Sequence, residues 1–75
     1  MTHLPLIEPT GGELLPLILG HLNAARKYEA QSAICKSRGL ERSAAEFTAA
    51  AREQYVEADE LEMLLTLEAL GGVHA

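Results

Sequence analysis

Length, composition and charge limit what this 75-residue chain can be. So short a chain forms one domain at most and buries only about 60–65% of its unfolded surface, so it needs help from a disulfide, a metal ion or a partner chain. The single Cys35 excludes an intramolecular disulfide. The net charge of −5, with six scattered Lys and Arg residues, argues against binding to nucleic acid.

Nothing in the sequence predicts a targeting or membrane segment. The N-terminal stretch MTHLPLIEPTGGE has no Lys or Arg ahead of its apolar residues, so it does not resemble a secretory signal. The apolar run from Leu14 to Leu19 is interrupted by Pro16 and is far shorter than the roughly 20 residues that span a bilayer. With its one cysteine, the chain is expected to be cytoplasmic, without membrane or nucleic-acid partners.

The first predicted helix follows a leader rich in Pro and Gly, residues 1–12. From Glu13 the pattern becomes helical, and Pro16 is tolerated because the first N–H groups of a helix have no intrahelical partner. The helix is expected to run over about 13–38. Its predicted inward stripe has three- and four-residue spacing and comprises Leu15, Leu19, Leu22, Ala25 or Arg26, Glu29 and Ala33.

The second predicted helix covers about 41–70 and is separated from the first by the sequence KSRGL. Gly39 suits the left-handed conformation that ends a helix, and Ser43 to Glu46 have the spacing of a capping box. Gly71 and Gly72 end the second helix and complete a hairpin over 13–72, followed by a tail over 73–75. The predicted inward stripe of this helix comprises Phe47, Ala51, Gln54, Ala58, Leu61 and Leu65.

These elements predict an all-α fold, a two-helix antiparallel hairpin. Both helices carry apolar residues on more than a narrow seam, with several leucines near their outer ends. A lone hairpin would leave this surface uncovered, so we expect a homodimer of hairpins that forms a four-helix bundle, or a larger homo-oligomer.

Several polar residues fall on or beside the inward stripes. Glu29 stands between Ala25 and Ala33, and a buried carboxylate needs a partner, a proton or a metal. Gln54 and Glu57 are three residues apart, so both can approach one point, and Glu53 precedes them. Counted outward from Gly39, His21 is level with Gln54 and Glu57, whereas Glu29 is level with residues nearer Glu46.

Oxygen ligands from several helices suit iron and other hard cations, so the candidate metal ligands are Glu29, Glu57, His21, Gln54 and Glu53. Each also has a purely structural interpretation. Glu29 and Glu57 can lie at the edge of the interface in contact with water, Gln54 can be a hydrogen-bonded core residue, and His21 can be partly buried and hydrogen-bonded. No catalytic motif is present.

The stretches LNAARKYEAQSAI and AREQYVEADEL resemble the first helical hairpin of ferritin-like proteins, bacterioferritins above all. The resemblance implies that Glu29 is a carboxylate ligand and that Gln54 and Glu57 occupy the positions of the family's Glu-x-x-His pair. Here that motif reads Gln-x-x-Glu, so either the ligand set is rearranged or the scaffold has lost its metal.

Two functions follow from these patterns. The first is a ferritin-like protein that binds iron at a carboxylate site between subunits and oxidises it, with ferroxidase-like activity. The second is a non-enzymatic structural or adaptor protein whose hairpin dimer binds a partner protein.

Overall fold

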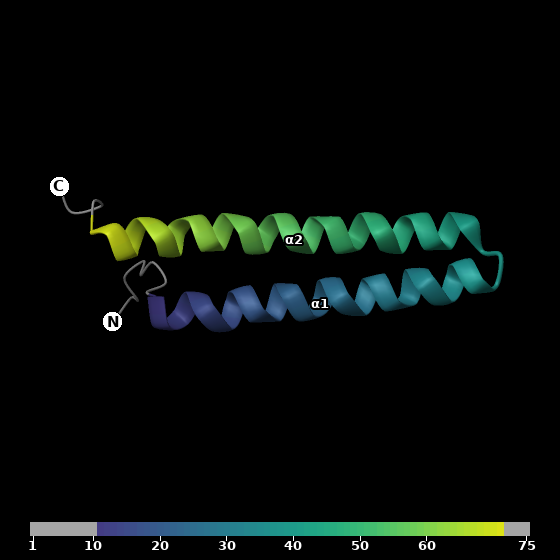
Figure 1. Cartoon of the computed structure of the whole chain (residues 1–75), viewed down its shortest axis with the longest axis horizontal. Coiled ribbons are helices and arrows are strands. Elements are labelled where there is room, and N and C mark those ends of the chain that lie inside the picture. The colour runs from purple at the N-terminus through teal and green to yellow at the C-terminus, as the bar shows by residue number, and fades with distance from the viewer. Residues whose placement is uncertain (1–10, 72–75) are drawn as a thin grey trace, which may run out of the picture.

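The computed structural model describes residues 11–71, which form two long helices and no strand. Helix α1 spans Gly11–Ser37 and helix α2 spans Glu41–Leu70. The helices lie side by side and antiparallel, with the start of α1 and the end of α2 at the same end of the molecule (Figure 1). The predicted helical hairpin is therefore confirmed. Residues 1–10 of the predicted leader and the tail over 73–75 lie outside the described residues.

The turn between the helices is closed by backbone hydrogen bonds. Gly39 has φ +76°, and its N–H bonds the Lys36 carbonyl at 3.0 Å, while the Leu40 N–H bonds the Cys35 carbonyl at 2.8 Å. This pair of bonds is a Schellman motif, and it satisfies carbonyls that the end of a helix leaves free. Gly71, with φ +70°, ends α2 in the same left-handed conformation.

Two details of the helix starts differ from the prediction. Helix α1 begins at Gly11, so Pro16 lies in its second turn and cannot bond the Gly12 carbonyl four residues earlier. Helix α2 is preceded by Leu40, which makes no side-chain cap, and Ser43 lies inside the helix. The predicted capping box is therefore absent, since the Schellman turn brings the chain directly into α2.

The side chains that pack between the two helices form a seam. In each helix the positions of this seam repeat every seven residues. In α1 the buried or half-buried positions of this seam are Leu14, Ile18, His21, Ala25, Tyr28, Ser32 and Cys35. In α2 they are Ala44, Phe47, Ala51, Gln54, Ala58, Leu61 and Leu65. Alternating three- and four-residue steps of this kind are the pattern of helices that pack like a coiled coil.

Small residues recur at every seventh position of the seam. Ala44, Ala51 and Ala58 are the buried residues of α2, and Ala25 is fully buried in α1. Small side chains let two helices approach closely. The seam positions between the alanines hold larger side chains, among them a stacked aromatic pair, Tyr28 and Phe47, with ring centroids 6.2 Å apart. Among residues 11–71, only Leu14 and Ile18 are large hydrophobic residues that are buried, so the core they form is small.

The inward stripe of α2 is as predicted. The predicted stripe of α1 is wrong, because the helix is rotated about its axis by about one residue relative to the prediction. Leu15, Leu19, Glu29 and Ala33 are exposed, whereas Leu22 and Ala25 do lie against α2. The seam uses the neighbouring row, in which Tyr28 stands where the predicted row has Glu29 and stacks on Phe47. This rotation also leaves the Glu29 carboxylate in water, which avoids its desolvation.

Candidate functional site

His21 and Gln54 face each other across the hairpin. His21 Nδ1 lies 2.7 Å from Gln54 Oε1, and both side chains are half-buried. With Oε1 as the acceptor, Nδ1 donates the hydrogen bond. The sequence predicts that these two residues are roughly level as counted from Gly39, and the structure brings them together.

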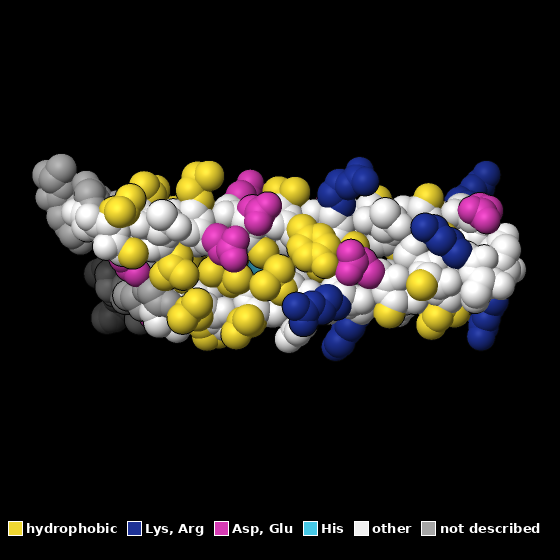
Figure 2. All heavy atoms as spheres, viewed as in Figure 1, with side chains coloured by type: hydrophobic (Ala, Val, Ile, Leu, Met, Phe, Trp, Pro, Cys, Tyr) yellow, Lys and Arg dark blue, Asp and Glu magenta, His cyan; other side chains and the backbone are white. Residues whose placement is uncertain are grey.

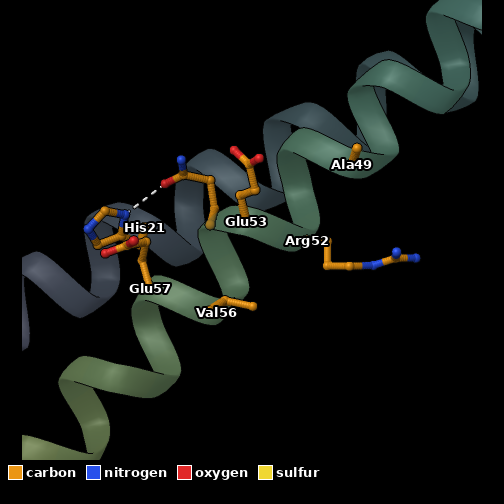
Figure 3. Close-up of a pocket in the computed structure, with 7 residues that line it drawn as sticks. His21, Ala49, Arg52, Glu53, Val56 and Glu57 are labelled. Atoms are coloured by element: carbon orange, nitrogen blue, oxygen red, sulfur yellow. Dashed lines mark hydrogen bonds between the residues drawn. The ribbon is translucent and has the colours of Figure 1, made fainter.

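Acidic side chains flank this pair on α2. Glu53 and Glu57 line one concave surface region of about 600 Å³ with His21, Gln54 and Arg52. In Figure 3 the Glu57 side chain lies beside His21, and the Arg52 side chain points away from the pair. Four of the five candidate ligands, all except Glu29, are therefore neighbours in one region that is open to solvent.

Glu29 lies on the other side of the seam and is exposed. Its Oε1 accepts a hydrogen bond of 3.0 Å from the Tyr55 hydroxyl, not a contact near Glu46 as predicted. Side chains lean toward the N-terminus of their own helix, so Glu29 leans away from the turn and Tyr55 leans toward it. This lean allows two residues at different distances from Gly39 to meet.

The carboxylate of Glu29 changes the acidity of Tyr55. The hydrogen bond to Glu29 raises the pKa of the Tyr55 phenol above its ordinary value, because it is donated only by the protonated form. Partial desolvation and the negative charge of Glu29 add to this effect, and the positive charge of Arg26 opposes it. No sequence pattern pointed to Tyr55.

Ser32 makes the buried polar contact of the seam. Its hydroxyl donates to the Ala44 carbonyl at 2.9 Å and lies 2.8 Å from the Thr48 hydroxyl. Because the single Ser32 proton goes to the carbonyl, Thr48 donates to Ser32. This buried group is satisfied, and it therefore marks a structural contact and no reactive centre.

Over residues 11–71, no three His, Cys, Asp or Glu side chains come close enough together to hold one ion. An iron site built from Glu29, Glu57, His21, Gln54 and Glu53 would therefore need side chains from a second chain.

Charge is divided between the two halves of the hairpin. We call residues 26–52 the turn half, and residues 11–25 with 53–71 the terminal half. The turn half holds all six Lys and Arg residues of the chain and three Glu residues, a net charge of +3. The terminal half holds seven Asp and Glu residues and no Lys or Arg, so the basic residues that look scattered in the sequence gather at one end.

Exposed apolar side chains are concentrated in the terminal half. Eight of the ten exposed large hydrophobic residues of the described chain belong to it. Figure 2 shows hydrophobic side chains gathered toward this end and Lys and Arg toward the turn. The eight residues are Leu15, Leu17, Leu19, Val56, Met63, Leu64, Leu67 and Leu70.

Neither described helix contains a stretch long and apolar enough to cross a membrane. Comparison of the chain with protein-family models, with curated proteins and with solved structures gives no significant match.

Proposed function

We propose that this chain is a non-enzymatic assembly protein. Two hairpins pair into a four-helix bundle, and the terminal half binds a further protein through its exposed leucines. The observation that carries the proposal is the concentration of exposed apolar side chains in a half of the hairpin that has acidic residues and no basic ones. Large exposed apolar patches rimmed by polar residues are typical of protein-binding surfaces.

The small core supports pairing. Four of the six buried hydrophobic residues are alanines, which bury little apolar surface. The larger seam residues Tyr28, Phe47 and Leu61 remain only half-buried. Burying a large apolar side chain contributes about 1.5–3 kcal/mol, so a second hairpin that covers these residues adds stability that one hairpin lacks.

Substitution of Phe47 tests the pairing. We expect Phe47→Glu to convert the dimer to a monomer in sedimentation velocity, because a carboxylate cannot be buried there without a partner. The matched control is Ile34→Glu, a substitution at an exposed residue of the turn half. A dimer that survives Phe47→Glu as well as Ile34→Glu would contradict pairing through this surface.

Partner binding is tested with exposed leucines that lie away from Phe47. The full chain, carrying an affinity tag, is purified under native conditions with and without the pair Leu19→Gln and Leu67→Gln. We expect a protein that co-purifies with the unchanged chain to be lost from this variant and kept by the control Ile34→Gln. The same proteins recovered with all three chains would show that the exposed leucines are not the binding surface.

A second candidate function is ferritin-like iron binding between two copies. The observation that favours it is the orientation of His21, whose Nδ1 is held by Gln54 while Glu57 and Glu53 line the same region. Histidines that bind metals are commonly oriented in this way, with the second nitrogen donating to an oxygen. Iron would be held by these side chains together with carboxylates of the second copy.

Iron binding is tested by anaerobic titration of the metal-free protein with Fe(II), followed by air and a record of the ferric absorbance. The iron candidate predicts saturable binding that is lost in both Glu29→Ala and Glu57→Ala, with helical content unchanged by circular dichroism. Binding that is equal in the unchanged chain and both variants would refute it.

A further inference from the structure

On one side of the hairpin the seam residues stay half-buried and are uncharged, with the exposed Glu57 beside them. Six half-buried residues at seven-residue spacing define this side, three from each helix, and we call it the uncharged face: His21, Tyr28, Cys35, Phe47, Gln54 and Leu61. Two contacts across the helices, the Tyr28–Phe47 stack and the His21–Gln54 hydrogen bond, belong to this face.

The opposite side of the seam is charged. There Glu29 bonds Tyr55, Arg26 precedes Glu29 by one turn, and Asp59 follows Tyr55 by one turn. Covering this side would desolvate charged groups, which is costly unless each is paired. A second copy gains most by covering the uncharged face, because Tyr28, Phe47 and Leu61 there are only half-buried.

The division of charge between the turn half and the terminal half favours one orientation of a second copy against the first. With the two turns at the same end, the acidic terminal halves would lie against each other, with seven carboxylate residues in each. With the turns at opposite ends, each acidic terminal half lies along the turn half of the other copy, which has a net charge of +3. Opposite charges attract along both edges of this arrangement, and it has the self-complementary two-fold symmetry of most dimers.

We infer that two copies dock face to face through the uncharged face with their turns at opposite ends. This inference rests on the proposed pairing and adds its surface and orientation. Helices of this length run about 40 Å and two side by side are about 20 Å wide, so each copy offers about 800 Å². An area of about 800 Å² per partner is the usual size of a specific interface.

When the two hairpins overlap along their whole length, the two-fold axis lies near the middle of α1. The His21–Gln54 layer of one copy is then nearly level with the Tyr28–Phe47 layer of the other. The two His21 residues are about 10 Å apart along the axis, at about 1.5 Å per residue. They are too far apart to share one ion, so this orientation also excludes an iron site built on both.

Distances between two spin labels test the orientation. In a Cys35→Ser background, a nitroxide is placed at exposed Ser37→Cys near the turn or at exposed Asn23→Cys near the middle of α1. With the turns at opposite ends, the axial separation is about 36 Å for the Ser37 site and about 6 Å for the Asn23 site. With the turns together, both axial separations are near zero.

Electron–electron double resonance is expected to give a longer distance for Ser37 than for Asn23, by about 10 Å or more. Equal short distances from a dimeric sample would overturn the orientation and leave the pairing intact. A monomeric mass in sedimentation velocity would overturn the pairing itself.

Discussion

Enlarging one small residue of the seam tests how the hairpin is held together. Ala25 is fully buried and stands level with Ala51, which is also buried. Replacing Ala25 by Leu adds three carbon atoms at a fully buried position of the seam. Overpacking of this kind costs about 1–3 kcal/mol, because neighbouring side chains and the backbone must shift.

The expected loss of stability can be measured as a decrease in melting temperature. For a domain of this size, 1 kcal/mol shifts the midpoint by about 4–8 °C, so Ala25→Leu is expected to lower it by roughly 4–24 °C. The measurement is thermal unfolding by circular dichroism at 222 nm, at one fixed protein concentration because pairing makes the midpoint depend on concentration.

The matched control is Ala30→Leu, at an exposed position of the same helix. This substitution is expected to change stability by no more than about 0.5 kcal/mol, as surface changes usually do. Equal midpoints for the two variants would refute the reasoning, since the spacing of the helices would then not depend on small seam residues.

Further predictions concern a hydrogen bond, two glycines and one phenol. Ser32→Ala is expected to lower the free energy of unfolding by about 0.5–1.5 kcal/mol in urea titrations, because it removes the bonded seam hydroxyl; no change would show that the bond adds nothing. Gly39→Ala should lower the free energy of unfolding by about 1 kcal/mol, because Gly39 has a positive φ. Gly20 lies inside α1 with open space around it, so Gly20→Ala should raise the free energy of unfolding by about 0.5–1 kcal/mol. Changes of the same sign in both variants would contradict this reasoning. The raised pKa of Tyr55 means that its contribution to stability is fully present below the ordinary phenol pKa and is lost as pH rises through the raised value. In NMR titrations with labelled tyrosine, Glu29→Ala should therefore lower the pKa of Tyr55; an unchanged titration would contradict the assigned cause.

Much of the fold follows from local signals in the sequence. Gly39 marks the turn because only a glycine adopts its left-handed conformation at little cost, and counting from it places His21 opposite Gln54. The inward stripe of α2 is also predicted, since its alanines and leucines have one helical period.

Which row of α1 faces α2 could not be predicted from the sequence of α1 alone. Two adjacent rows, one through Leu15 and Leu19 and one through Leu14 and Ile18, are both apolar. The rows differ most at Glu29, a carboxylate in the predicted row where the neighbouring row has Tyr28. The cost of burying that carboxylate is the signal that would have identified the correct row.

The candidate site was predicted only in part, for a related reason. His21 and Gln54 meet because they are level, but Glu29 and Tyr55 meet because their side chains lean in opposite directions along the molecule. The charge division is likewise visible only when the chain is folded back at Gly39, which brings distant acidic residues to one end.

Pairing of the hairpins is the central claim, and the mass of the unchanged chain in solution tests it most directly. Sedimentation equilibrium at micromolar concentration should give twice the chain mass of 8.1 kDa, and the melting temperature should rise with protein concentration. A species of 8.1 kDa with full helical content and a melting temperature independent of concentration would contradict the claim.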